Sequence, residues 1–159
     1  MRKWSFLLLI ALVYIIPLWP QAGLLPPNDD PASYIGLTLL ELYDRLGPPE
    51  SVYAARGPEE WQDDVVFVYK QGDFYILKDR VWQTGLKSAM GIRAGDNVAT
   101  VSLILGSIDS ARPAESVDSS GGQKPVFYFL DGKSWPMILR CEFDKQGRVT
   151  MIFIYRSDL

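Results

Sequence analysis

Acidic pairs are the clearest residues in this chain that could do chemistry. Glu59–Glu60 stand shortly before Asp63–Asp64, and Asp29–Asp30 form another pair nearer the amino end. Paired carboxylates can hold a hard cation or carry out acid-base work. Proline or glycine flanks these acids, and adjacent acids in such loops are usually solvated. We therefore expect no metal site and no catalytic site at these positions.

Histidine is absent from the 159 residues, and Cys141 is the only cysteine. These counts exclude Ser-His-Asp and Cys-His mechanisms, zinc sites that need histidine, and an intramolecular disulfide. Cys141 shares one side of an expected strand with Leu139 and Phe143, so we interpret it as a small buried hydrophobic residue. The sequence also lacks a P-loop, a dinucleotide-binding glycine fingerprint and a nucleophile elbow. We expect a protein that is not an enzyme and has no cofactor.

The composition limits the class of protein further. A hydrophobic fraction of 48% with 13% aromatic residues excludes a disordered tail, and a net charge of −3 argues against a nucleic-acid binder. The length allows one ordinary domain or two small ones.

The amino-terminal segment has the pattern of an export signal. Arg2 and Lys3 precede Trp4–Trp19, an uncharged and largely apolar run of sixteen residues. We interpret residues 1–23 as a signal peptide or an uncleaved amino-terminal anchor, with membrane association through residues 4–19. Residues 24–32 are rich in proline and read as a linker. The predicted location is the periplasm or the cell exterior, or the inner membrane for an anchored form.

Two segments of the chain resemble each other. Residues 36–47 and 95–106 align at an offset of 59, with glycine at both ends and the same apolar spacing. That spacing predicts two short amphipathic helices. Thr38 and Glu41 have the order of a capping box at the start of the first helix, and Asp96 or Asn97 can cap the second. Gly47 and Gly106 stand where the last residue of each helix can adopt a left-handed conformation.

Strands rich in aromatic and β-branched residues follow each expected helix. Short turns containing glycine separate them, which favours antiparallel pairing. The fold class we expect is α+β, a tandem repeat of two helix-plus-antiparallel-sheet units at residues 33–89 and 90–159 that form a shared or adjoining sheet. The expected strands are Val65–Tyr69, Phe74–Lys78, Arg80–Leu86, Pro125–Leu130, Met137–Asp144 and Arg148–Arg156.

The repeated glycine and leucine pattern, with the hairpin Glu142–Val149, resembles the SmpA/BamE-type envelope proteins. The tandem arrangement is similar to the β-lactamase-inhibitory protein fold. The resemblance covers about residues 33–159. It implies an exported protein that binds another protein, either as an inhibitor or as an accessory to outer-membrane assembly.

Alternation along the last two strands predicts which residues face a partner. We expect Val149, Met151, Phe153 and Tyr155 to lie under the helices. The opposite face would then carry polar and apolar residues suited to solvent or to a partner, and exposed aromatic residues would anchor the contact. The predicted protein-binding residues are Trp61, Tyr75, Trp82, Trp135, Arg140, Glu142, Ile152, Ile154 and Arg156.

The function we expect is protein binding by an exported, non-catalytic module, through the exposed sheet face and loops. The partner would be another envelope or secreted protein and not a nucleic acid, and the oligomeric state is left open. An alternative is a membrane-anchored structural scaffold. A further alternative, a small-ligand binder or hydrolase, would need a deep pocket with convergent polar groups.

Overall fold

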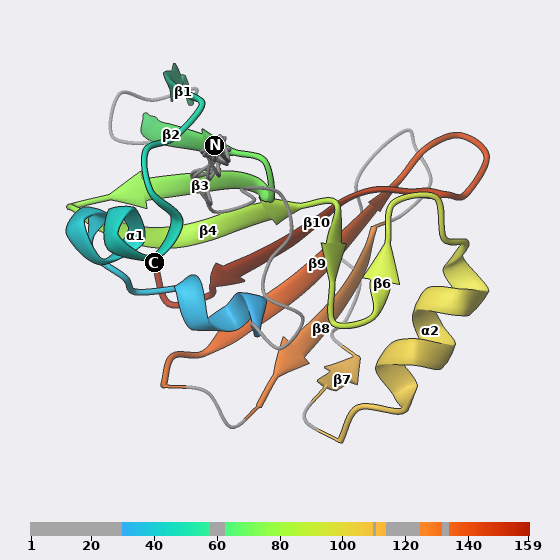
Figure 1. Ribbon diagram of the computed structural model, residues 1–159. Helices are drawn as coiled ribbons and strands as arrows, with labels where there is room; N and C mark the ends of the chain where they lie inside the picture. Colours follow the sequence, from blue (N-terminus) through green and yellow to red (C-terminus); the bar gives the residue numbers. More distant parts are fainter. Residues whose placement is uncertain (1–29, 58–62, 110, 114–124, 132–133) are drawn as a thin grey trace, which may run out of the picture.

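One antiparallel sheet of eight strands dominates the protein (Figure 1). The computed structural model describes residues 30–57, 63–109, 111–113, 125–131 and 134–159. In chain order the elements are η1 (Pro31–Tyr34, a 3₁₀ helix), α1 (Leu39–Leu46), β1 (Ser51–Ala55), β2 (Asp64–Tyr69), β3 (Gly72–Leu77), β4 (Arg80–Leu86), β5 (Ser88–Ala89), β6 (Ile92–Arg93), α2 (Val98–Gly106), β7 (Ala111–Pro113), β8 (Val126–Leu130), β9 (Met137–Phe143) and β10 (Val149–Arg156).

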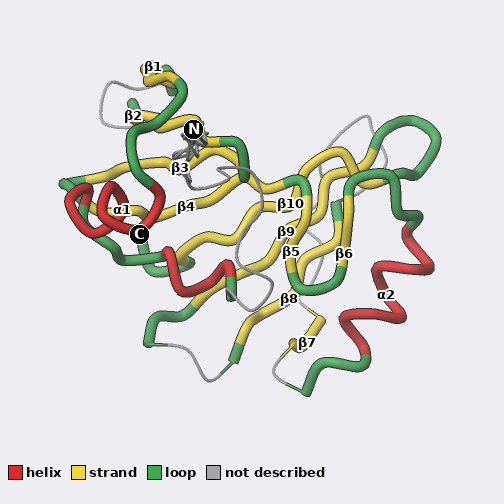
Figure 2. The backbone as a smooth tube through the Cα atoms, in the orientation of Figure 1, coloured by secondary structure: helices red, strands yellow, loops and turns green. Residues whose placement is uncertain are grey.

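The predicted tandem repeat of two helix-plus-sheet units was wrong. The strands form a single sheet in the order β1-β2-β3-β4-β10-β9-β8-β7, and the described chain has only two short α-helices (Figure 2). β4 and β10 pair directly, from Ile152 opposite Leu86 to Tyr155 opposite Gln83. Backbone hydrogen bonding therefore runs through the centre of the sheet without a break. The predicted boundary between residues 89 and 90 lies in the turn between β5 and β6, and the division into two domains stays a prediction.

Both predicted helices are present, and side-chain caps define where they begin. Before α1, the Thr38 side chain accepts a hydrogen bond from the Glu41 backbone N–H while the Glu41 carboxylate accepts one from the Thr38 N–H. Before α2, Asn97 accepts a hydrogen bond from the Thr100 N–H at 2.9 Å. Gly47 ends α1 with φ of 77°, a conformation that glycine adopts without steric cost. Gly106 differs from the prediction because it lies inside α2, which Ser107 caps in a right-handed conformation.

The principal strands agree with those expected from the sequence within two residues at each end, whereas β1, β5, β6 and β7 were not predicted. A tight turn joins β3 to β4, and its two residues, Lys78 and Asp79, have φ of 49° and 65°. Positive φ at both positions is what a two-residue hairpin turn of type I′ requires.

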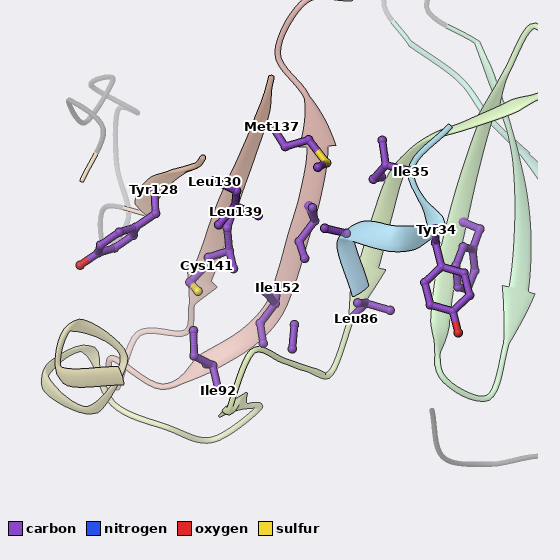
Figure 3. Packing of buried hydrophobic residues seen from close by; sticks show 14 of the residues in the cluster. Tyr34, Ile35, Leu86, Ile92, Tyr128, Leu130, Met137, Leu139, Cys141 and Ile152 are labelled. Atoms are coloured by element: carbon purple, nitrogen blue, oxygen red, sulfur yellow. The ribbon is translucent and has the colours of Figure 1, made fainter. Parts of the chain in front are cut away.

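The core lies between the sheet and the short elements that cover one of its faces. Side chains from η1, α1, the β5–β6 hairpin and α2 join those of β2–β4 and β8–β10 in one buried cluster. Figure 3 shows Tyr34 of η1 on the same side of the sheet as Leu86 of β4, and Ile92 beside Ile152 and Cys141. The two halves of the chain thus share one core, which suits sequences near the lower size limit for independent folding.

A β-bulge decides which side of β10 faces this core. The register with β9 shifts between Val149 and Met151, so that Thr150 is an extra residue. Val149 and Ile152 therefore both point toward the helices, although strict alternation would separate them. The predicted face for β10 was wrong beyond Val149. Ile152 and Ile154 are fully buried in the core, and Met151, Phe153 and Tyr155 belong to the opposite side.

The predicted signal peptide or anchor, and all but the last residues of the predicted linker, lie outside the described residues. Within the residues that the structure describes, no helix is both long and apolar enough to span a membrane.

Candidate functional site

Aromatic side chains gather on the face of the sheet that lies away from the helices, and five of them belong to β1, β3, β4 and β10. The pairing register places them there: Tyr53 is opposite Val66, Val66 is opposite Tyr75, and Tyr75 is opposite Gln83. Directly paired residues in antiparallel strands share a face. Gln83 is in turn opposite Tyr155 on β10. We call this surface the aromatic face and define it by Tyr53, Tyr75, Trp82, Phe153 and Tyr155.

Edge-to-face ring contacts hold the centre of the aromatic face. The Tyr75 ring lies 6.5 Å from Trp82 and 6.4 Å from Phe153, with interplanar angles of 73° and 61°. The backbone of Gly85 forms the floor, since a Cβ atom there would lie 3.1 Å from the Phe153 ring. Such T-shaped pairs stabilise a fixed ring arrangement beyond the burial of their area. The centre of this face is therefore a pre-formed surface.

Trp82 reaches the aromatic face because β4 is irregular. The register between β3 and β4 shifts between Tyr75 and Ile76, which leaves Trp82 as an extra residue between Val81 and Gln83. The Trp82 indole Nε1 donates a hydrogen bond to Asp64 Oδ1 at 2.9 Å. Partial burial raises the pKa of Asp64, while the hydrogen bond from Trp82 acts in the opposite direction.

A second half-buried acid, Asp73, contributes to the raised pKa of Tyr75. Burial raises the pKa of Asp73, and Lys87 opposes that shift. Burial is also the largest cause that raises the pKa of Tyr75 to about 12, with Tyr53, Asp73 and Asp64 as further causes. The part of the aromatic face around Tyr75 thus has two acidic side chains, Asp64 and Asp73, close to the phenol.

Arg140 marks the other side of the aromatic face. Its guanidinium lies 4.5 Å from the centre of the Phe153 ring and 5.9 Å from that of Tyr155. Its Nη2 pairs with Glu142 Oε1 at 3.0 Å. Its Nε is buried and has no hydrogen-bond partner in the described part of the protein. Stacking on two rings and one ion pair hold this cation in place.

Trp135 and Arg156 lie elsewhere, on the helix side of the sheet. Arg156 is opposite the buried Met137, and its guanidinium lies 3.9 Å from the centre of the Trp135 ring. It also forms a bidentate pair with Asp158, and the Trp135 indole packs beside Gly36. A half-open hollow of about 260 Å³ adjoins them, lined by Asp30, Ala32, Ser33, Ile35, Ser134, Trp135 and Met137.

The structure thus divides the predicted binding residues among three places. Tyr75, Trp82, Arg140 and Glu142 come together on the aromatic face, and Trp135 and Arg156 lie near the hollow. Ile152 and Ile154 are in the core and cannot touch a partner, and Trp61 lies outside the described residues. Sequence reasoning missed Tyr53, because its strand was not predicted, and Asp64, because its acidic neighbours suggested a solvated loop.

Asp30, Asp63 and the cysteine take structural positions in this fold, while Asp29 and Glu59–Glu60 lie outside the described residues. Asp63 pairs with Arg56, and Asp30 accepts a hydrogen bond from the Ala32 N–H at 3.0 Å to begin η1. Burial raises the pKa of the Cys141 thiol to about 12, so the thiol is protonated at neutral pH. Among the residues that the structure describes, no group of three or more acidic or cysteine side chains could hold a metal ion.

Comparison with known proteins gives one structural likeness. No family model and no curated protein matches the chain. The fold is similar to part of an extracellular protein containing an SCP domain from Bacillus anthracis str. Ames, with a TM-score of 0.51 and 11% sequence identity. The match covers 88% of this chain and 50% of that one, so the chain spans about half the length of its structural neighbour. The likeness concerns the fold alone, and the resemblance to SmpA/BamE-type proteins stays a prediction.

Proposed function

We propose that this chain is an exported, non-catalytic protein-binding module whose aromatic face is the contact surface. The observation that carries the proposal is the cluster of ring contacts among Tyr75, Trp82 and Phe153, beside the exposed Tyr53, on a face that no described element covers. Tyrosine and tryptophan are the side chains that most often anchor protein interfaces. The partner would be another envelope or secreted protein.

The geometry favours a broad contact over a small-ligand site. The aromatic residues spread over β1, β3, β4 and β10 rather than surrounding a cavity. The half-open hollow beside Trp135 lies on the other side of the sheet, and its acid already caps η1. A protein surface fits the first arrangement better than a metabolite does.

The more general part of the proposal is that the protein is exported, and two observations support it. Residues 1–23 have the pattern of a signal peptide, and the structural neighbour is an extracellular protein. The more specific role, as an inhibitor or as an accessory to assembly in the envelope, rests on the resemblance to the SmpA/BamE-type proteins.

Site-specific photo-crosslinking in the producing cells tests the contact surface. A benzophenone amino acid replaces Tyr53 on the aromatic face in one variant and Leu103 on α2 in the control. Both side chains are exposed, at 46% and 76%. We expect a discrete protein adduct with the Tyr53 variant and none with the Leu103 variant. Adducts only from Leu103, or none from either variant, would overturn the proposal.

A further inference from the structure

The acid beside Trp82 lacks a cationic partner within the described part of the chain. Asp64 is half-buried, and its hydrogen bond comes from the uncharged Trp82 indole. The neighbouring cation Arg56 is paired with Asp63. Taking a carboxylate out of water costs free energy unless a cation or hydrogen bonds compensate. This end of the aromatic face therefore has a negative charge that a cation would stabilise.

Among the residues that the structure describes, no strand pairs with the outer edge of β1, next to Asp64. β1 is the terminal strand of the sheet, and it contains neither a charged residue nor proline. Val52 and Tyr53 are 49% and 46% exposed. Protected edges usually carry charges, proline or bulges. β1 has none of these devices, so its outer backbone groups can pair with an extended segment of another protein.

Ala55 connects this edge to the acid. It is directly opposite Asp64 in the register of β1 and β2, so the two side chains share a face. A residue added opposite Ala55 would lie about 10 Å from Asp64, two strand spacings away. Only a methyl group stands between them. A long cationic side chain can cross that distance and lie along the rings of Tyr53, Tyr75 and Trp82, where cation–π attraction adds to the ion pair.

We propose that β1 binds an extended segment of the partner by strand addition, and that a lysine or arginine of this segment, opposite Ala55, pairs with Asp64 among the three rings. Strand addition supplies affinity through backbone hydrogen bonds, and the Asp64 site selects the cationic residue. The inference rests on the proposed function and names the chemistry of the partner at that same face.

Synthetic peptides test the selection for a cation. One peptide alternates threonine and valine around a central lysine, and its match has norleucine in place of lysine. Binding to the full chain is measured by calorimetry. We expect the lysine peptide to bind at least about tenfold more tightly than the norleucine peptide. Equal affinities, or no binding of the lysine peptide, would overturn the inference.

Two protein variants test the role of Asp64. Asp64→Asn removes the charge and keeps an oxygen that can accept the Trp82 hydrogen bond. Asp44→Asn, on α1, removes the same charge from an exposed position. The preference for lysine should disappear in Asp64→Asn and persist in Asp44→Asn. If Asp64→Asn still prefers the lysine peptide, the lysine binds another acidic residue and the proposal is contradicted.

Backbone methylation of the peptide tests strand addition. The N–H groups of an added strand point alternately toward β1 and away from it, so two peptides are methylated on the two alternate sets of amides. One set should abolish binding and the other leave it unchanged. Equal effects of both sets would contradict pairing with β1. If Tyr53 forms an adduct in cells but lysine gives no preference, the proposed function stands and this inference fails.

Discussion

The two faces of the central sheet carry different side chains and serve different purposes. On the helix-covered face, Leu139, Cys141, Ile152 and Ile154 are fully buried and have no charged group among them. On the aromatic face, ring contacts alternate with partly exposed acids and with the stacked Arg140. One face therefore stabilises the fold, while the other keeps polar groups that a core would exclude. This difference points to the aromatic face as the surface available for binding.

The largest expected contrast concerns the reactivity of Cys141. The pKa of this buried thiol is about 12, against about 8.5 for a free cysteine. At pH 8 a thiol reagent should therefore modify the native protein at least about a thousandfold more slowly than the same protein in denaturant. The rate is measured from the absorbance of the thiol that a disulfide reagent releases when it reacts with Cys141, in native and in denatured protein. Fast modification without denaturant would show that the helix-covered face opens readily.

Adjacent residues of β9 offer a direct comparison of the two faces. Leu139 is fully buried under the helices, and Ile138 is half-buried on the aromatic side. Leu139→Ala should lower the free energy of unfolding by about 2 to 5 kcal/mol, because it leaves a cavity in the core. Ile138→Ala should cost less than about 1.5 kcal/mol, since it loses less buried area. Urea unfolding measures both values, and equal losses would contradict the contrast.

Replacing two glycines by alanine compares a crowded position under the aromatic face with an uncrowded position on α2. A Cβ atom at Gly85 would press against Phe153, so Gly85→Ala should destabilise the protein by about 1 to 3 kcal/mol. At Gly106, on α2, a Cβ atom would meet nothing within 4 Å. Gly106→Ala should stabilise the protein by about 0.4 to 1 kcal/mol. Thermal unfolding followed by circular dichroism should show opposite shifts of Tm. A higher Tm for Gly85→Ala would mean that Phe153 does not lie over Gly85.

The smallest expected effect is the pH dependence contributed by Asp64. Folding raises the pKa of this carboxyl group above 3.8, so its contribution to stability is full below that pH and decreases as the pH rises through the folded pKa. Asp64→Asn should therefore be slightly more stable than the natural chain at pH 7, by less than about 1 kcal/mol because the group keeps much of its solvent contact. The difference should vanish in acid. Unfolding curves at pH 3 and pH 7 measure it, and a variant less stable at pH 7 would contradict the direction of the shift.

Local patterns in the sequence predicted the helices and the central strands well. The capping box of Thr38 and Glu41 and the cap of Asn97 act between neighbouring residues, so the sequence reveals them directly. The long strands from Asp64 to Leu86 and from Val126 to Arg156 are rich in aromatic and β-branched residues. The short strands carry a weaker signal, since β1 has only Val52 and Tyr53 and β7 has neither an aromatic nor a β-branched residue. Pairing with a neighbouring strand makes these segments extended.

Irregular pairing explains most of the errors about the site. The extra residue Thr150 in β10 reversed the predicted face, which placed Ile152 and Ile154 at a binding surface and Phe153 and Tyr155 in the core. A bulge depends on the partner strand, and one sequence alone carries little trace of it. The fold class failed for a related reason. Similar helices at a regular offset predict two local units, but they do not reveal that β4 and β10 pair across the middle of the chain.

The pairing of β4 with β10 has a consequence for the order of folding. β10 lies between β4 and β9 in the sheet, yet it follows every other described strand in the chain. During synthesis the strands from β1 to β4 must therefore wait, with one edge unpaired, until residues 149–156 have left the ribosome. Such long-range pairing slows folding and exposes an aggregation-prone edge meanwhile.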